Sequence, residues 1–296
     1  MRVPLTTLLY LLPSLPLLSS QKPHDRFATE SRLVLVNATV LDAQNRVRTD
    51  LQAKDFSLYE DGHPVQVHSV SLEDVPTSTI ILLDVSGSMK TTIGYEREAL
   101  ERFLGKTRQG DEYCLVLFSN KVEPECDFDS DPHSVRAKAA RAVPEGDTSV
   151  IDALMFGLNR VKDAHNTRRA ILVLSDALDT SSRYKWREAR NYALESTATI
   201  YAVSPPVWDD AGQANSLELK RIVEETGGRF LMANKRNLLA DYMDRLEIRL
   251  QYMISFLPAT QQSDASFHKI NLQLRGPNRK GQRAYWRHGY YATTSP

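Results

Sequence analysis

The residues Ile80-Ile81-Leu82-Leu83-Asp84-Val85-Ser86-Gly87-Ser88 join a run of apolar side chains directly to a short polar loop. Four consecutive aliphatic residues fit a strand whose two faces are both buried, as in a parallel sheet. The loop then presents one carboxylate and two hydroxyls at alternate positions, and Gly87 relieves backbone crowding between them. We therefore expect a cluster of oxygen ligands at the carboxyl end of a buried strand.

Strands and helices alternate along the chain on either side of this stretch. Apolar runs predict strands at residues 79–84, 112–118, 122–128, 170–175, 199–203 and 229–232. Apolar residues at helical spacing predict helices at 95–104, 133–142, 150–161, 186–194 and 217–225, and from 238 to about 250. Such alternation predicts an α/β fold with a doubly wound, mostly parallel, Rossmann-like sheet over residues 77–250.

Shorter strands separated by turns fill the segments before and after this region, at residues 31–75 and 251–296. Strands are expected at 33–41, 56–59 and 65–67, and again at 252–257, 267–275 and 285–291. Asp61-Gly62 lies between two such runs, and Asp-Gly is a strong hairpin signal. Because a few strands alone are marginally stable, we expect the two terminal segments to pack together as a smaller β module.

Residues 1–20 have the layout of a secretory signal peptide. Arg2 gives a positive start, residues 5–18 are almost wholly apolar, and a pair of serines ending at Ser20 suits cleavage. Two prolines interrupt a run that is already shorter than the roughly 20 apolar residues of a membrane-spanning helix. We expect a secreted or periplasmic protein with no integral membrane segment after cleavage. Whether the segment is instead retained stays open.

Charge and cysteine content exclude several classes of protein. The 37 Lys and Arg residues balance 37 Asp and Glu residues, so the net charge points to no nucleic acid or anionic membrane. Only two cysteines, Cys114 and Cys126, are present, which excludes a disulfide-dense scaffold. If a turn around Asn120 pairs Ser119 with Lys121, the two cysteines face each other at disulfide distance. A turn one residue longer or shorter forbids the bridge, so this question stays open.

Oxygen ligands for a cation follow three of the predicted elements. Asp84, Ser86 and Ser88 stand on the loop described first. Thr148 precedes an expected helix, and Asp176 follows an expected buried strand. Carboxylate and hydroxyl oxygens suit a hard cation, Mg²⁺ above all, with Mn²⁺ or Ca²⁺ as alternatives.

These five positions, in this order and context, resemble the von Willebrand factor A family, whose metal-ion-dependent adhesion site pairs Asp-x-Ser-x-Ser with a distant Thr and Asp. The resemblance spans about residues 77–250. It implies that Ser86 and Ser88 bind the metal directly, while Asp84 acts mainly through water and the loop backbone. It also implies that Thr148 and Asp176 exchange between direct and water-mediated coordination. An open metal position would take an acidic side chain from a partner.

Residues 54–62, Lys-Asp-Phe-Ser-Leu-Tyr-Glu-Asp-Gly, and residues 287–292, Arg-His-Gly-Tyr-Tyr-Ala, carry a second resemblance. They are similar to exported bacterial proteins of the von Willebrand factor A-related group common in acidobacteria. One departure from the family is Asp147, where many relatives have glycine. An added carboxylate there would strengthen cation binding or repel an acidic partner.

Other patterns give weaker signals. Acidic residues alternate from Glu123 to Asp131, but Pro132 and Lys138 break a calcium-loop pattern, so a charged edge strand is the better interpretation. The basic residues of 265–296 are interpreted as a solvated face, or as a complement to acidic surface elsewhere, and not as a nucleic-acid site. The sequence contains no phosphate loop, no Gly-x-Ser-x-Gly elbow and no histidine zinc pattern.

The sequence therefore predicts an exported binding or adhesion protein that is not an enzyme. Its metal would recognise an Asp or Glu side chain of a protein partner, and nucleic acid is not expected as a ligand. An alternative is a metal-assisted hydrolase, for which Asp147 or Asp179 would have to supply the base. Another is a structural envelope component whose metal only holds the loops. The partner, the choice of metal and the oligomeric state stay open.

Overall fold

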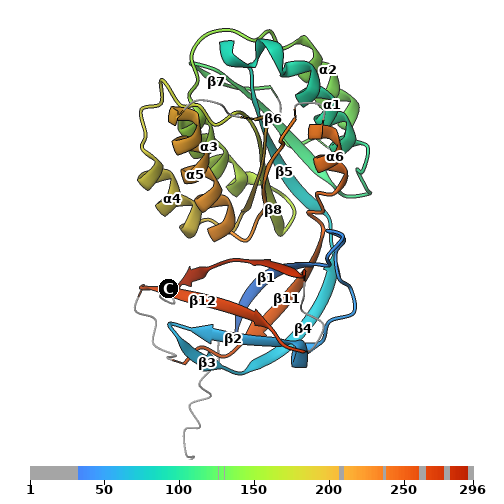
Figure 1. Ribbon diagram of the computed structural model, residues 1–296, viewed down its shortest axis with the longest axis vertical. Coiled ribbons are helices and arrows are strands. Elements are labelled where there is room, and N and C mark those ends of the chain that lie inside the picture. The colour runs from blue at the N-terminus through green and yellow to red at the C-terminus, as the bar shows by residue number, and fades with distance from the viewer. Residues whose placement is uncertain are drawn as a thin grey trace, which may run out of the picture. The chain divides into compact units, whose positions relative to one another are not determined.

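The computed structural model describes residues 33–125, 127–129, 131–206, 210–235, 238–259, 265–276 and 281–292. The expected signal peptide at residues 1–20, and Cys126, lie outside these residues. The described chain contains two kinds of architecture, a sheet covered by helices and a set of strands without them (Figure 1).

A six-stranded sheet forms the centre of the α/β part, in the order β10-β9-β8-β5-β6-β7. All neighbours in it are parallel except β6 and β7, which pair antiparallel. The strands are β5 (Thr77–Asp84), β6 (Glu112–Phe118), β7 (Val122–Pro124), β8 (Arg168–Leu174), β9 (Thr199–Ser204) and β10 (Phe230–Met232). Every residue of β5 is buried, which is why its sequence is apolar without alternation.

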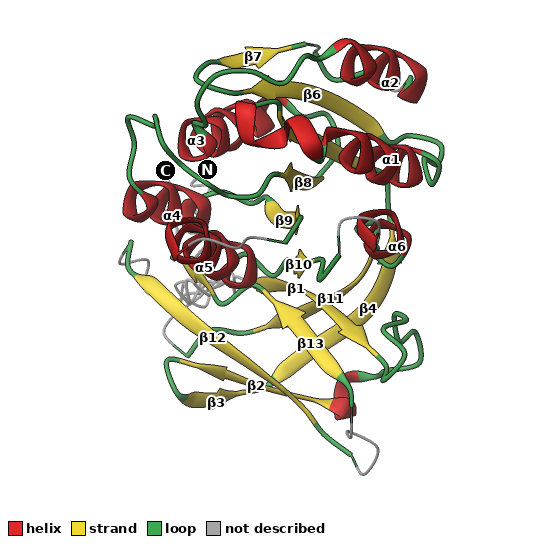
Figure 2. Ribbon diagram, turned by 45° about the horizontal axis from the view of Figure 1, so that its top comes forward, coloured by secondary structure: helices red, strands yellow, loops and turns green. Residues whose placement is uncertain are grey.

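Helices cover both faces of this sheet. The helices are α1 (Ile93–Leu104), α2 (Pro132–Arg141), α3 (Val150–Arg160), α4 (Trp186–Glu195), α5 (Asp210–Glu225) and α6 (Leu239–Asp244). Ile80 and Leu82 pack with α3, α4 and α5 on one face, and Ile81 and Leu83 pack with α1, α2 and α6 on the other. Figure 2 shows α4 and α5 on one side of β8 and β9, with α1 and α6 on the opposite side.

The topology of the sheet places a crevice beside β5. After β5 the chain passes into α1 on one face, and after β8 it passes into α4 on the other face. The connections from these two neighbouring strands therefore leave in opposite directions, which defines a switch point of the doubly wound sheet. Ligands in such folds bind beyond the carboxyl ends of the strands at this point.

The two terminal segments pair with each other in two four-stranded antiparallel sheets, β13-β1-β11-β4 and β14-β12-β2-β3. Their strands are β1 (Val34–Leu41), β2 (Phe56–Glu60), β3 (His63–Val65), β4 (Val67–Asp74), β11 (Leu250–Phe256), β12 (Phe267–Leu274), β13 (Arg283–Trp286) and β14 (Gly289–Tyr291). Asp61 and Gly62 form the predicted hairpin turn between β2 and β3, with φ of 48° and 85°. The predicted fold class, an α/β domain with a smaller β module built from both terminal segments, is confirmed.

Some predicted elements have different bounds. The helix expected from 238 to about 250 ends at Asp244, where the Lys106 ammonium donates to the carbonyl oxygens of Met243 and Asp244 at 2.7 and 2.6 Å. Strand β7 ends at Pro124 and does not continue to residue 128, and β4 was not predicted beyond residue 67.

The strand expected at 285–291 is two strands, because the residues between them face the α/β part. The half-buried Arg287 side chain donates from its guanidinium to the carbonyl oxygens of Leu194 and Ala198, at 3.2 and 2.9 Å. The backbone nitrogen of His288 donates to the carbonyl oxygen of Glu225 at 2.9 Å. These contacts take residues 287 and 288 out of the regular β pairing.

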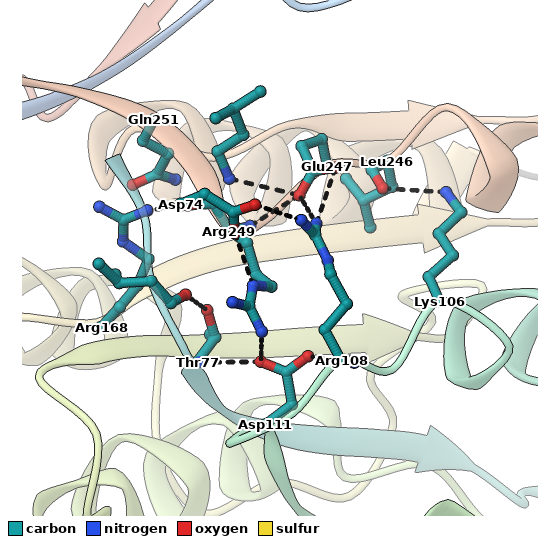
Figure 3. Close-up of polar contacts among 12 residues, drawn as sticks. Asp74, Thr77, Lys106, Arg108, Asp111, Arg168, Leu246, Glu247, Arg249 and Gln251 are labelled. Atoms are coloured by element: carbon teal, nitrogen blue, oxygen red, sulfur yellow. Dashed lines mark hydrogen bonds and ion pairs between the residues drawn. The ribbon is translucent and has the colours of Figure 1, made fainter. Parts of the chain in front are cut away.

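The α/β part is inserted between β4 and β11, two strands that pair with each other. Asp74, at the end of β4, is opposite Leu250, at the start of β11. Beside this pair, the Arg249 guanidinium bonds to carboxylate oxygens of Asp74 at 2.8 Å and Asp111 at 3.0 Å (Figure 3). Asp111 in turn accepts the backbone N–H of Thr77 at 3.0 Å. The chain therefore leaves and rejoins the β module within one polar network.

Candidate metal site

Backbone hydrogen bonds hold three loops together at the switch point. The Gly87 nitrogen donates to the Gly146 carbonyl oxygen at 2.8 Å, and the Glu145 nitrogen donates to the Val85 oxygen at 2.8 Å. The carbonyl oxygen of Thr148 accepts hydrogen bonds from the backbone N–H groups of residues 180 and 181, at 2.9 and 3.0 Å. The loop after β5, the loop before α3 and the loop after β8 are therefore joined in sequence. These are the loops that carry the five predicted ligands.

Two glycines allow this close approach. A Cβ atom on Gly87 would lie 3.1 Å from the carbonyl oxygen of Gly146, tighter than most Cβ contacts. Gly146 itself has φ of 77°, a left-handed conformation that side chains rarely adopt. The absence of a side chain at Gly87 therefore favours the contact between the two loops, and Gly146 supplies the backbone conformation that the second loop adopts.

Asp84 is fully buried, and both of its carboxylate oxygens accept hydrogen bonds. One accepts the backbone N–H of Ser86 at 2.9 Å, and the other accepts the hydroxyl of Ser175 at 2.6 Å. Ser175 is the last residue before Asp176, so the side chain that orients Asp84 comes from the loop after β8. The sequence analysis did not identify Ser175, since a serine at the end of a strand carries no distinctive signal.

The hydroxyl groups lead from this buried carboxylate to the surface. Ser86 is fully buried, its Oγ lies 3.0 Å from the Oγ of Ser88, and Ser88 is exposed. Thr148 is 3% exposed, and its backbone nitrogen donates to the hydroxyl of Thr180 at 3.0 Å. Asp176 is half-buried and accepts the backbone N–H of Leu178 at 3.0 Å. The candidate ligands therefore extend from the buried carboxylate of Asp84 to side chains that reach solvent.

Carboxyl groups at the site interact across the gap between the loops. Burial raises the pKa of Asp84 from 3.8 to about 7, and the negative charge of Asp176 adds to this rise, while bonds from Ser175 and Ser86 oppose it. In the folded protein without a cation, a charge on Asp84 is therefore unfavourable. A bound cation would remove this penalty.

Glu96 is a third acidic side chain near the site, and sequence reasoning missed it. It lies on α1 and is 1% exposed, and neither of its carboxylate oxygens has a hydrogen-bond partner among the described residues. Burial raises its pKa well above the usual value, and Asp84 and Asp176 raise it further. A signal was present: Glu96 shares a helix face with Leu100 and Phe103, four and seven residues later, where an apolar side chain is expected.

The carboxylates do not form a metal centre by themselves. In the described part of the chain, no three His, Cys, Asp or Glu side chains are close enough together to hold one ion. Hydroxyl oxygens would therefore have to supply much of the coordination. The residues present fit this requirement, because Ser86 and Ser88 share the loop of Asp84, and the loop of Thr148 is hydrogen-bonded to both the loop after β5 and the loop after β8 that carries Asp176.

Two hollows flank these loops. One has a volume of about 830 Å³, and residues lining it include Lys121, Ser149, Ser181, Arg183 and Tyr184. The other has a volume of about 630 Å³, and residues lining it include Val85, Lys121, Lys138, Val143 and Gly146. Apolar side chains stand open to solvent beside both, since Val143 is 70% exposed and Tyr184 is 40% exposed.

The two bases considered for a hydrolase are differently placed. The carboxylate of Asp179 accepts the Ser182 hydroxyl at 2.5 Å and the Ile151 backbone N–H at 3.4 Å, so it is engaged in holding the start of α3. Asp147 is exposed. Neither arrangement holds a carboxylate in a buried position beside the hydroxyl ligands.

A second polar cluster lies in the β module. The Ser266 hydroxyl and Nε2 of His268 are 3.0 Å apart, and Nδ1 of His268 lies 2.8 Å from a carboxylate oxygen of Asp61. Asp61 also accepts the backbone N–H of Lys269 at 2.8 Å. These bonds attach the turn between β2 and β3 to strand β12. They give the buried His268 a structural role.

Comparison with known proteins agrees with this architecture. Residues 79–178 match the family model of the von Willebrand factor type A domain. A von Willebrand factor type A protein from Catenulispora acidiphila is similar in structure, with a TM-score of 0.52 and 11% identity. The match covers 90% of this chain and 74% of that one. At this identity the likeness is one of fold.

Two further solved structures are similar over a smaller part of the chain. The von Willebrand factor domain of the type V pili tip protein Mfa5 from Porphyromonas gingivalis has a TM-score of 0.48 and 15% identity, covering 58% of this chain and 93% of that one. An aerotolerance-related membrane protein from Bacteroides fragilis has a TM-score of 0.47 and 15% identity, covering 57% and 97%. No curated protein matches the sequence. No helix in the described ranges has the length and apolar character needed to cross a membrane.

Proposed function

We propose that this chain is an exported, non-catalytic binding protein that holds one divalent cation through Asp84, Ser86, Ser88, Thr148 and Asp176. The cation, Mg²⁺ in the first place and Mn²⁺ or Ca²⁺ as alternatives, would accept an Asp or Glu side chain of a protein partner. The main support is the donor set, which runs from a fully buried carboxylate to an exposed hydroxyl. A cation there would be bound by ligands on its buried side, and a coordination position on its solvent-exposed side would remain for a partner.

The spacing of the serine hydroxyls favours a small, hard cation. Mg²⁺ binds oxygen at about 2.0–2.1 Å in octahedral geometry, so two adjacent ligands lie about 3.0 Å apart. The Oγ atoms of Ser86 and Ser88 have this separation, 3.0 Å. The two hydroxyls can therefore occupy neighbouring positions around one ion without moving.

The surroundings of the site favour a protein as the partner. Val143 and Tyr184 offer exposed apolar surface beside the two hollows, and the lining of both hollows includes Lys121 together with acidic side chains. Apolar and aromatic contacts around a central polar anchor are typical of protein interfaces. A small substrate would need no such surface on both sides of the metal.

The proposal is tested first by metal binding and then by partner capture. Calorimetric titration of the chelator-treated protein with MgCl₂, MnCl₂ and CaCl₂ should show one site, and Asp84→Asn should lose it. Immobilised protein should then retain proteins from the envelope fraction of the source organism with Mg²⁺ and release them with EDTA. Retention that is the same with and without metal would contradict the proposal.

The hydrolase alternative is tested in the same preparation. Metal-dependent turnover of p-nitrophenyl acetate or p-nitrophenyl phosphate, lost in Asp84→Asn, would favour an enzyme over a binding protein. We expect no turnover above that of the free metal ion. A structural role is distinguished by metal binding without any metal-dependent capture of protein.

A further inference from the structure

Glu96 and Glu60 are two buried glutamates that differ in one respect. Glu60 is 2% exposed, and its two carboxylate oxygens accept the Tyr290 hydroxyl at 2.5 Å and the Ala259 backbone N–H at 2.7 Å. Glu96 is 1% exposed, and neither oxygen has a partner among the described residues. Burying a carboxyl group without hydrogen bonds is costly. A group that completes the surroundings of Glu96 is therefore to be expected.

The charges that act on Glu96 are negative. Asp84, at the end of β5, and Asp176, after β8, are the two side chains whose charges reach it. Asp84 and Asp176 lie at the carboxyl-terminal end of the sheet, where the proposed cation would lie, and Glu96 lies in the first turn of α1, the helix that follows β5. The partner that Glu96 lacks is therefore not another acidic group. A cation with its bound waters would offset the negative charges, and its waters would donate hydrogen bonds to the Glu96 oxygens.

Distance decides how Glu96 would act. Glu96, Asp84 and Asp176 are not close enough together to be ligands of one ion. Mg²⁺ dehydrates reluctantly and keeps several waters in protein sites. A water bound to the cation can bridge to a carboxylate that lies one layer further out, and such outer partners tune the affinity of metal sites.

We propose that Glu96 accepts a hydrogen bond from a water on the cation and supplies a third negative charge to the site. It is a positioning residue for the metal, and this role rests on the proposed cation site. One consequence is that the cation is retained when no partner is bound, because the protein itself supplies a charge of −3 against +2. Another consequence is that, once the metal is removed, the buried carboxyl group of Glu96 on α1 has no hydrogen-bond donor among the described residues and no cation to offset its charge.

The test compares Glu96→Gln with the matched variant Glu60→Gln in the full exported chain. For Glu96→Gln, calorimetric titration with MgCl₂ should show affinity reduced by about tenfold to a hundredfold, the usual effect of losing an outer partner. In EDTA this variant should melt no lower than the wild type, because a neutral amide replaces a buried acid. Its increase in Tm on adding Mg²⁺ should be smaller than that of the wild type.

Glu60→Gln should behave in the opposite way. It should melt lower than the wild type both with and without Mg²⁺, because a satisfied acceptor in the β module is disturbed, and its Mg²⁺ affinity should be unchanged. If Glu96→Gln fails to fold, Glu96→Leu offers an apolar side chain for the same helix face and is measured in its place.

The outcomes separate the two proposals. Wild-type affinity for Mg²⁺ in Glu96→Gln, or in Glu96→Leu, would overturn the role of Glu96 and leave the cation site standing. A wild-type protein that binds none of Mg²⁺, Mn²⁺ and Ca²⁺ would overturn the cation site itself. A lower Tm of Glu96→Gln in EDTA with full Mg²⁺ affinity would show that Glu96 serves the fold alone.

Discussion

The backbone nitrogen of Gly87 donates a hydrogen bond to the carbonyl oxygen of Gly146 over 2.8 Å, so the loop with both serine ligands rests on the loop that carries Thr148. The distance between these loops fixes how far apart the hydroxyls lie. Because a metal ion tolerates little change in ligand spacing, this contact bears directly on cation affinity.

Gly87→Ala should weaken metal binding. The added Cβ would lie 3.1 Å from the Gly146 oxygen, so the loops must separate by a few tenths of an ångström. We expect about tenfold lower Mg²⁺ affinity and a stability loss of about 1–3 kcal/mol, measured by calorimetry and urea unfolding. Gly94→Ala in α1 is the control, because a Cβ there meets nothing within 4 Å. Equal affinities in the two variants would contradict this role of Gly87.

Asp84→Ala should abolish metal-dependent partner binding, and Asp84→Asn should do so with less damage to the fold. The asparagine oxygen can still accept the Ser86 N–H, and its amide can donate to the Ser175 hydroxyl. Alanine removes the acceptor of the Ser86 N–H and of the Ser175 hydroxyl hydrogen, although the Ser175 oxygen still accepts the Ala177 N–H at 2.9 Å. Circular dichroism and thermal unfolding check the fold, and capture from the envelope fraction checks binding. Undiminished binding by Asp84→Asn at equal Mg²⁺ would remove Asp84 from the site.

Thr148→Ala should weaken partner binding more than metal binding. The family resemblance implies that the threonine hydroxyl coordinates mainly when a partner is bound, while the backbone of Thr148 already has its contacts to residues 180 and 181. Calorimetry with MgCl₂ and retention of envelope proteins measure the two effects separately. Thr148→Ser keeps the hydroxyl and is the control. Equal losses in both assays would show that Thr148 is a static ligand.

Stability of the metal-free protein should fall as pH rises. The pKa of Asp84 in the folded chain is about 7, above the value of 3.8 for an unperturbed carboxyl, so between these values the folded state keeps a proton that the unfolded state has lost. The loss of stability is complete above about pH 7 and corresponds to roughly 4 kcal/mol. Urea unfolding in EDTA at about pH 5 and about pH 8 measures the part of this loss that falls between those two pH values, roughly 3 kcal/mol. Asp84→Asn should lack this component, and saturating Mg²⁺ should remove it from the wild type.

A disulfide between Cys114 and Cys126 is expected after export. The predicted register is confirmed for the described residues, since Val116 is opposite Pro124 and Leu117 is opposite Glu123. Cys126 lies outside the described residues, and Tyr113 pairs with Asp129, two positions off that register, so the bridge stays a prediction. The closed loop of about 13 residues would contribute at most about 3 kcal/mol. Intact mass after alkylation under denaturing conditions decides: two adducts without prior reduction would rule the bridge out, and reduced protein is the control.

Patterns that depend on neighbours in the sequence predicted the fold well. The run from Ile80 to Leu83 is apolar without alternation because both faces of β5 are covered, and the strand expected at 112–118 has the observed bounds of β6. The helix expected from 238 to about 250 was too long for a different reason. Leu246 and Ile248 do face the same core as Met243, but they reach it after the helix has ended.

The candidate site was only partly accessible to such patterns. Asp84 and the two serines share one loop, so their spacing is visible in the sequence. Ser175 matters through its hydrogen bond to Asp84, and a serine at a strand end is not unusual. Glu96 stands out as an acid on an apolar helix face, but its nearness to Asp84 and Asp176 is not visible in the sequence. The burial of Glu96 beside Asp84 follows from the packing of α1, which local spacing does not specify.

The pairing of Asp74 with Leu250 has a consequence for how this molecule can be rearranged. A segment that departs and returns at facing residues of two adjacent strands can be cut out without severing any other strand, and a tight turn can close the gap. The remaining β module would keep every strand that the structure describes in it. Conversely, the excised portion has its two ends side by side and is suited to transplantation onto an unrelated carrier. Natural exchange of one α/β portion for another would require the same two junctions and partners for Arg287 and His288, which contact the α/β part.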